Sequence, residues 1–393
     1  MRSLITITLL FLFYYLTVSA QTQEKRDNPS DSVQSIESNK CSDAYIDLGT
    51  GGDGICFGNS IRHNGIRFNV IDCGVQEVNG INITFWRGDD KTLDNFRMSG
   101  ISLGLMPSVG YSEGIAVGIG SVEGKKDLEG LNFGGAALVS GGVMEGINIG
   151  GIACVTGKDM TGINLGGLAC VAGKSKTGIN IGGLASVAGT EMTGINIGGL
   201  ACVAGTDMTG INIGGLACVS RGSATGINFG GLACVGNEIS GINFGSLATV
   251  GQGELTGINF GGLALVGSKG ITGFNFGGFG LVADKGSITG LNLTIGKLQS
   301  GIEITGLNFA AYKIEAPEIT GMSICCAWIE CDEITGFSIA PYCRTKKRMT
   351  GLSIAILNYA EELNGVQMGL LNIADNNEAG TNILPVLNAH IEF

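Results

Sequence analysis

Apolar and polar positions recur along this chain with a fixed period. The run 161–173, TGINLGGLACVAG in single letters, returns almost unchanged from Thr177, Thr193 and Thr209. Weaker copies follow as far as Thr350, and the step between neighbours is 16 residues in most cases and 15 near the C-terminal end. A fixed period of this length indicates a repeat architecture in which each unit is one structural element.

Each unit combines fixed apolar and Gly positions with one short variable stretch. Charged residues are confined to the variable stretch, as with Lys174 and Lys176, so we expect this stretch to be a solvated turn. The unit has Gly at four of its sixteen positions, β-branched residues between them and no 3.6-residue spacing. These features exclude a helix, and the units are therefore predicted to be β.

Two all-β architectures fit a unit of this length. In a β-solenoid each unit of about 16 residues is one coil, and equivalent residues stack on parallel neighbours about 4.8 Å apart. In an outer-membrane antiparallel β-barrel each repeat would be one strand of about 11 residues followed by a turn. The uniform step and the double Gly favour the solenoid, because barrels alternate short turns with long loops and Gly weakens pairing in mid-strand. The clean alternation that ends at Phe393 favours the barrel, which stays the alternative.

Two further expectations follow from the solenoid. The double Gly at 166–167 is predicted to form a corner, and a corner would turn Ile163, Leu165 and Leu168 inward together although their strand parity differs. One Asn recurs in every unit, and stacked side-chain amides can hydrogen-bond from coil to coil. The predicted structural ladder consists of Asn164, Asn180, Asn196, Asn212 and Asn228.

The chain divides into four segments. Residues 1–20 are predicted to be a signal peptide, because one positive charge precedes an apolar stretch with a small-x-small end at Ala20. Residues 21–60 are expected to be a flexible polar leader. Residues 61–289 form the regular repeat array, and residues 290–393 are irregular repeats expected to cap it, or to close the barrel in the alternative.

Composition narrows the function further. The 393 residues include 69 Gly and only two His, and the net charge is −11, which argues against nucleic acid as a partner. His63 and His390 are far apart in the sequence, and the chain contains no nucleophile elbow, phosphate loop or paired Cys/His spacing. We therefore expect no enzymatic activity, no cofactor and no metal.

The cysteines fall into two groups. Among the 12 Cys, five share one repeat position: Cys154, Cys170, Cys202, Cys218 and Cys234. Ser186 and Leu265 occupy the same position in other units, so the site is expected to need a small or apolar core residue rather than a thiol. Cys41, Cys56 and Cys73 precede the regular array and are the candidates for disulfide bonds, with the pairing left open.

Three stretches carry a resemblance to a known family. They are VNGINITFW at 78–86, the tandem Gly-Ile-x-Ile-Gly-Gly-Leu units, and LNGVQMGLLN at 363–372. Together they resemble a group of Gly-rich surface-repeat proteins of Gram-negative bacteria (Bacteroidetes and spirochaetes), to which no activity is assigned. The resemblance spans roughly residues 60–393 and implies placement at the cell surface or in the outer membrane.

These observations predict a non-enzymatic exported surface repeat protein with a structural or adhesive binding role at the outer membrane. Its partner would be a surface ligand of unknown kind: a polysaccharide, a protein or a membrane component. The alternative is an outer-membrane barrel with a pore or transport role.

Overall fold

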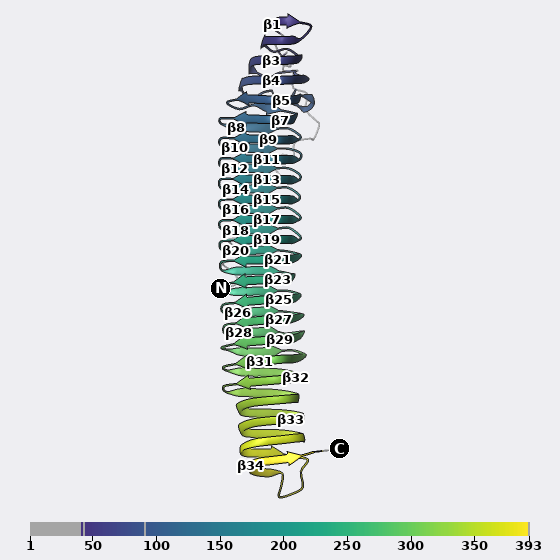
Figure 1. Cartoon of the computed structure of the whole chain (residues 1–393), viewed down its shortest axis with the longest axis vertical. Coiled ribbons are helices and arrows are strands. Elements are labelled where there is room, and N and C mark those ends of the chain that lie inside the picture. Colours follow the sequence, from purple (N-terminus) through teal and green to yellow (C-terminus); the bar gives the residue numbers. More distant parts are fainter. Residues whose placement is uncertain (1–40, 42–43, 90–91, 392–393) are drawn as a thin grey trace, which may run out of the picture. The chain divides into compact units, whose positions relative to one another are not determined.

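The computed structural model describes residues 41, 44–89 and 92–391. Residues up to Cys41 form a unit separate from Ser42–Phe393, and the predicted signal peptide lies outside the described residues. The second unit is a column of stacked β coils from Tyr45 to His390 (Figure 1). The only helical element of the described part is the short 3-10 helix η1, and no helix there is long and apolar enough to cross a bilayer.

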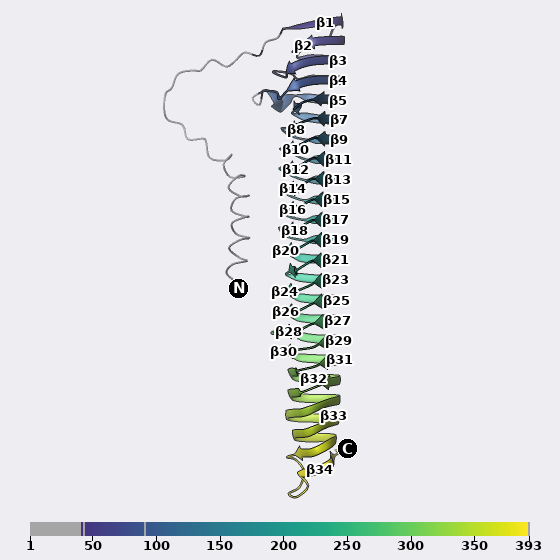
Figure 2. The same ribbon diagram turned by 90° about the vertical axis from the view of Figure 1, so that its left-hand side faces the viewer.

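Each regular coil consists of one long and one short strand. Strand β17 (Met192–Gly198) is followed by β18 (Ala201–Ala204), and the next coil begins with β19 (Met208–Gly214). Long strands pair in parallel with long strands, and short with short, so that Asn196 is opposite Asn212 and Cys202 is opposite Cys218. The two kinds of strand therefore form two stacks (Figure 2). This parallel, in-register pairing confirms the solenoid, and the antiparallel one-strand-per-repeat alternative is wrong.

The elements before the regular coils are β1 (Tyr45–Thr50), β2 (Asp53–Gly58), β3 (Arg62–Ile71), β4 (Glu77–Trp86), η1 (Leu93–Asn95), β5 (Arg97–Gly104), β6 (Ser108–Val109), β7 (Tyr111–Gly118), β8 (Ser121–Gly124), β9 (Leu128–Gly134) and β10 (Ala137–Ser140). The remaining long strands are β11 (Met144–Gly150), β13 (Met160–Gly166), β15 (Lys176–Gly182), β21 (Ser223–Gly230), β23 (Glu238–Gly245), β25 (Glu254–Gly261), β27 (Gly270–Gly277), β29 (Ser287–Thr294) and β31 (Glu303–Ala310). The remaining short strands are β12 (Ala153–Thr156), β14 (Ala169–Ala172), β16 (Ala185–Ala188), β20 (Ala217–Ser220), β22 (Ala233–Gly236), β24 (Ala248–Gly251), β26 (Ala264–Gly267), β28 (Gly280–Ala283) and β30 (Lys297–Ser300). The chain ends with β32 (Lys313–Cys325), β33 (Trp328–Ala374) and β34 (Ile383–His390).

One side of every long strand faces the interior of the coil. In the coil of β13, Asn164 is fully buried, whereas Ile163 is 38% exposed and Leu168 is 50% exposed. The expectation that Ile163, Leu165 and Leu168 all turn inward is therefore wrong. The reason is strand parity: neighbours in a strand point to opposite faces, so an inward Asn164 forces Ile163 and Leu165 outward.

A column of glycines sets the path of the long strands. From Gly65 to Gly351 one Gly per coil has a φ between 104° and 127°, a region that side-chain-bearing residues rarely adopt. Gly194 is one of them, and a Cβ there would overlap the carbonyl oxygen of Gly178 in the preceding coil. Both the backbone conformation and the close approach between coils therefore require Gly at this position.

The two ends of the column differ from the prediction. Strands β1 and β2 lie within the segment 21–60, so the predicted flexible leader extends too far; β2 pairs in parallel with β3 like any coil, and β1 returns antiparallel to β2. At the other end, regular coiling continues through β33, and only β34 departs by pairing antiparallel to it. The end of the interior is thus covered by one reversed strand, rather than by the whole segment 290–393.

Candidate functional site

A continuous ladder of amides runs through the interior. Each Nδ2 donates to the Oδ1 of the Asn in the next coil over 2.8–3.0 Å, from Asn132 to Asn308. All of these side chains are essentially fully buried. The five residues predicted for the ladder lie in its middle: Asn164, Asn180, Asn196, Asn212 and Asn228. Each amide satisfies its neighbour, which removes the cost of burying polar atoms in a narrow core.

The ladder is interrupted at one coil near its N-terminal end. The row of the ladder continues from Asn132 of β9 to Ala116 of β7 and then to Ser102 of β5, which are paired in register. Within the part of the chain that the structure describes, the buried Oγ of Ser102 and Oδ1 of Asn132 have no hydrogen-bond partner. Ala116 has no polar side-chain atom to join them. A single apolar residue therefore leaves two buried polar atoms unsatisfied.

Replacing Ala116 by Asn is expected to join the two sides of this interruption. The new Nδ2 would donate to Asn132, and the new Oδ1 would accept from Ser102, which should raise the free energy of unfolding by about 1–2 kcal/mol. Urea denaturation followed by circular dichroism measures the change. Ala116→Leu adds similar bulk without polar atoms and is the control, so equal effects of the two substitutions would contradict a hydrogen-bonding role.

The interior also contains a row of sulfur atoms opposite the amides. Four Cys of the short strands, Cys154, Cys170, Cys202 and Cys218, approach the thioether of a Met in the preceding long strand, with Sγ–Sδ distances of 3.5 Å for Cys202 and Met192 and 3.6 Å for Cys218 and Met208. At Cys234 the Met position is taken by Ala224. Burial raises the pKa of Cys202 to about 12. Because these thiols are fully buried, they act as core residues.

One charged side chain lies inside this sulfur row. Lys176 occupies the Met position of β15 and is fully buried, so the expectation that it belongs to a solvated turn is wrong. Its Nζ donates to the carbonyl oxygen of Cys170 over 2.7 Å and to Oγ of Ser186 over 2.8 Å. Burial lowers the pKa of Lys176. Lys176 and Ser186 replace the usual Met and Cys together, so each polar group satisfies the other.

A buried polar cluster fills the core near the N-terminal end, and no sequence motif pointed to it. Arg67 is fully buried and pairs with Asp72. Its guanidinium also donates to Asn82 over 2.8 Å and to Asn59 over 3.0 Å, while Thr84 donates to Asp72 over 2.7 Å. Arg67 stands in the same row as Asn82, which places the cluster in line with the amide ladder. The cluster thus replaces amides by an ion pair where the coils begin.

The three candidate disulfide cysteines have different fates. Cys41 is in a disulfide bond rather than a free thiol, and the same holds for Cys73. Cys56 is a free thiol and is completely buried.

The two histidines each contact another residue through one ring nitrogen. Nε2 of His63 lies 3.1 Å from the carbonyl oxygen of Gly54, and Nδ1 of His390 lies 2.7 Å from Oδ1 of Asn377.

The outside of the column carries rows of exposed apolar side chains. On the long strands from β13 to β31, three rows point outward and form a surface that we call the Ile face. One row is Thr or Ser, one is Ile, Phe or Leu, and the third is Leu, Ile or Phe. In the middle row Ile195 is 37% exposed and Ile258 is 49% exposed. In the third row the rings of Phe229, Phe244 and Phe260 stack with centroids 5.0 and 4.7 Å apart.

A second apolar surface follows the corner after the double Gly. We call this row the Leu edge: Ile152, Leu168, Leu184, Leu200, Leu216, Leu232, Leu247, Leu263 and Phe279. Each residue is 45–70% exposed, and the backbone at the corner is hydrogen-bonded from coil to coil, as from Leu200 N to Leu184 O over 2.7 Å. Most charged residues of the same coils lie at or beside the opposite turn: Lys158, Asp159, Lys174, Glu191, Asp207, Arg221, Glu238, Glu254, Lys269, Asp284 and Lys285. The exceptions are buried Lys176 and Glu145, which lies on β11. The column is therefore amphipathic in cross-section.

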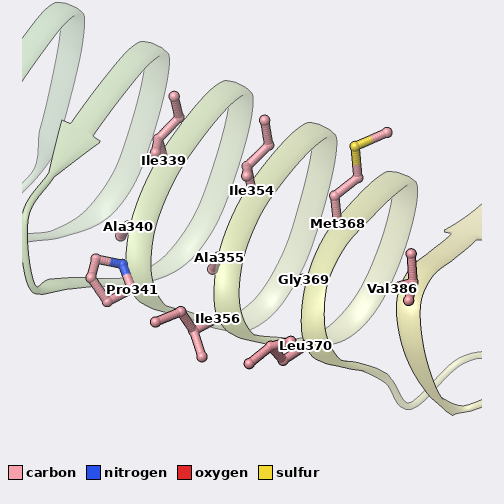
Figure 3. A pocket seen from close by; sticks show the side chains of 10 residues that line it. All are labelled: Ile339, Ala340, Pro341, Ile354, Ala355, Ile356, Met368, Gly369, Leu370 and Val386. Atoms are coloured by element: carbon pink, nitrogen blue, oxygen red, sulfur yellow. The ribbon is translucent and has the colours of Figure 1, made fainter.

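Near the C-terminal end the outer surface is hollowed into an apolar groove of about 600 Å³. Ile339, Ile354 and Met368 line one side of it, and it also includes Ile356 and Leu370, each two residues further along its coil (Figure 3). A similar groove of about 480 Å³ lies near the N-terminal end, where residues of the same rows, such as Phe68 and Ile83, contribute. Both grooves offer apolar contact rather than a set of catalytic groups.

The interior and the outer surface of the column therefore carry different kinds of residue. Titratable groups in the interior are closed off by backbone, whereas the accessible surface between β13 and β28 consists of apolar and hydroxyl side chains with charges along one turn. Such a surface can bind another apolar surface by removing both from water. The chain matches no protein-family model, no curated protein and no solved structure, so this geometry is the basis for a functional proposal.

Proposed function

We propose that this protein is a non-enzymatic structural component exported to the cell surface of a Gram-negative bacterium, where it binds through its outward apolar rows. The observation that carries the proposal is the Leu edge, a straight line of protruding Leu side chains with no charge beside it. Monomeric soluble proteins rarely expose long contiguous apolar patches, and larger patches mark interaction sites.

The construction of the column supports a load-bearing or adhesive role. From β11 to β30 each coil is joined to the next by two parallel strand pairs and by the buried amide ladder. In such a solenoid each coil contacts only its neighbours, so length can be added without changing the cross-section. A rigid, elongated element of this kind suits display of a repeated surface.

The signal-peptide pattern at 1–20 and the family resemblance support export. The apolar rows favour a ligand that is itself apolar, such as a membrane component or an apolar protein surface, over a polysaccharide. The stacked Phe rings present edges rather than faces outward, since each face is covered by the next ring. Sugar binding by aromatic stacking needs exposed ring faces.

The proposal is tested with cells that produce a variant carrying charged residues on the Leu edge. With Leu200→Lys and Leu216→Lys together, adhesion of the cells to hydrocarbon droplets should fall by at least about tenfold relative to the unchanged protein. The control carries Thr193→Lys and Thr209→Lys, which add the same charge to the same coils without removing apolar surface. Equal adhesion of both variants would contradict the proposed binding role.

Surface placement is measured on the same cells. Lys158, Lys174 and Lys269 are exposed, so a membrane-impermeant amine reagent should label the protein in intact cells. Labelling that appears only after lysis would show that the protein is not at the surface.

A further inference from the structure

The Ile face is unusually uniform. Its ten long strands are the odd-numbered strands from β13 to β31, paired in register throughout. The first row, which we call the Thr row and which lies nearest the charged turn, is Thr161, Thr177, Thr193, Thr209, Thr225, Ser240, Thr256, Thr272, Thr289 and Thr305. The middle row is Ile163, Ile179, Ile195, Ile211, Ile227, Ile242, Ile258, Phe274, Leu291 and Leu307. The third row is Leu165, Ile181, Ile197, Ile213, Phe229, Phe244, Phe260, Phe276, Leu293 and Phe309. None of these thirty positions is charged.

The area of this face equals that of a protein interface. Ten strands spaced about 4.8 Å apart, each contributing five residues at about 3.3 Å, cover roughly 800 Å². The largest apolar patch on a typical monomer is about 300–600 Å², whereas a stable complex buries about 800 Å² on each partner. With its Thr row included, the face is therefore large enough for a specific dimer.

The spacing of the side chains restricts what can cover the face. Ile195, Ile211 and Ile227 stand in register on neighbouring strands, so ridges and gaps alternate at the strand spacing of about 4.8 Å. A partner interlocks with such ridges only if its own side chains have the same period. A second copy of this chain has that period by construction, whereas a lipid layer has none.

The charges of the chain do not oppose this pairing. The net charge of −11 would make two copies repel each other if it were spread over the face. Apart from buried Lys176 and from Lys297 on the short strand β30, the charged residues of these coils lie at or beside the turn, as with Glu191 and Asp207, and so remain in solvent when two faces meet. The Thr row lies between the apolar rows and that turn, and its hydroxyls supply the polar rim that interfaces have.

We propose that the Ile face is the interface between two copies of this chain, which pack face to face like the two sheets of a β-sandwich. This inference rests on the proposed binding role, and it names a second copy of this chain as the partner of the Ile face. The Leu edges remain exposed on the outside of the pair for other ligands.

Analytical ultracentrifugation of the purified exported protein, over a concentration range up to about 100 µM without detergent, tests the proposal. The unchanged protein should sediment as a dimer. Ile211→Lys with Ile227→Lys places four charges in the dimer interface and should raise the dissociation constant at least about 100-fold. The matched control, Leu216→Lys with Leu232→Lys, adds the same charge to the same coils at the Leu edge and should remain dimeric. Circular dichroism and the thermal midpoint establish that both variants are folded.

Three outcomes would overturn the proposal: a monomer at the highest concentration, a dimer that persists in the Ile variant, or dissociation of the Leu-edge control. Flotation with neutral phosphatidylcholine vesicles adds a fourth arm. If a monomeric unchanged protein floats with the vesicles and the Ile variant does not, a lipid surface covers the face and the dimer proposal fails. Loss of adhesion on cells is a separate readout, so failure of the dimer leaves the proposed surface role standing.

Discussion

Gly194→Ala is expected to destabilise the central coils by about 3–5 kcal/mol, because backbone strain of about 1–3 kcal/mol adds to an overlap of similar cost. Gly194 has a φ of 108°, and its Cβ would overlap the carbonyl oxygen of Gly178, which belongs to the backbone and has no free rotation to avoid it. The two coils would have to separate, and the hydrogen bonds of β15 with β17 would lengthen. The urea midpoint measures the loss.

The chain contains a matched control for this substitution. Gly280 occupies a position of β28 that is Ala in the preceding coil, at Ala264, and a Cβ there meets only Val282 at 3.8 Å. Gly280→Ala should be neutral or stabilise by about 0.4–1 kcal/mol, since it reduces the freedom of the unfolded chain. If Gly194→Ala is tolerated as well as Gly280→Ala, the close approach between coils does not determine the need for Gly.

Asn196→Ala is expected to cost about 2–5 kcal/mol through the amide ladder. Asn196 accepts from Asn180 over 2.9 Å and donates to Asn212 over 2.9 Å. Truncation leaves one buried donor and one buried acceptor unsatisfied, each at about 1–3 kcal/mol. Hydrogen exchange of the amides of β15, β17 and β19 should become faster than that of distant coils, because repeat proteins open locally.

A second substitution separates hydrogen bonding from packing. Asn196→Asp keeps the shape but removes the donor, and burial raises the pKa of such a carboxyl because its charged form is disfavoured. A raised pKa in the folded state means that the folded protein binds more protons than the unfolded chain, so stability is present at low pH and is lost as pH rises. Asn196→Asp should therefore approach the stability of the unchanged protein near pH 4 and fall below it at pH 7. A pH-independent deficit would contradict the ladder.

The exposed amide pair of Asn79 and Asn64 provides the control for both substitutions. Asn79 Nδ2 donates to Asn64 Oδ1 of the preceding coil over 3.0 Å, and both side chains are in contact with solvent. Water can replace that bond, so Asn79→Ala should cost no more than about 0.5 kcal/mol.

Much of the fold could be predicted from the repeat alone. A step of 16 residues with Gly at fixed positions allows a β coil, and one Asn per unit gives the amide ladder as soon as the units stack in parallel. The leader was predicted to extend to residue 60, although Gly54-Ile55 already matches Gly65-Ile66 and pairs with it in the structure. The shorter loop between these two copies concealed the first coil.

Two buried charged residues were missed in the sequence. Lys176 belongs to a charged stretch, and only its alignment with Met160 and Met192 across the coils shows that it points inward. Arg67 likewise lies in the row of Asn82, among residues that in the sequence suggest an ordinary polar strand. In both cases the partner that satisfies the charge lies on another strand, which a local pattern does not reveal.

By itself, the amino-acid sequence determined the period, the composition of every row, and the fact that Ile195 and Asn196 lie on opposite sides of their strand. Only the tertiary structure decided which of the two sides is the interior. Alternation with a period of two shows which residues share a face of the strand, but it does not show which face points to the interior. A rule based on hydrophobicity alone would have placed the Ile row inside. The narrow coil instead encloses the amides, which satisfy one another from coil to coil, and this leaves the Ile and Leu rows on the outside.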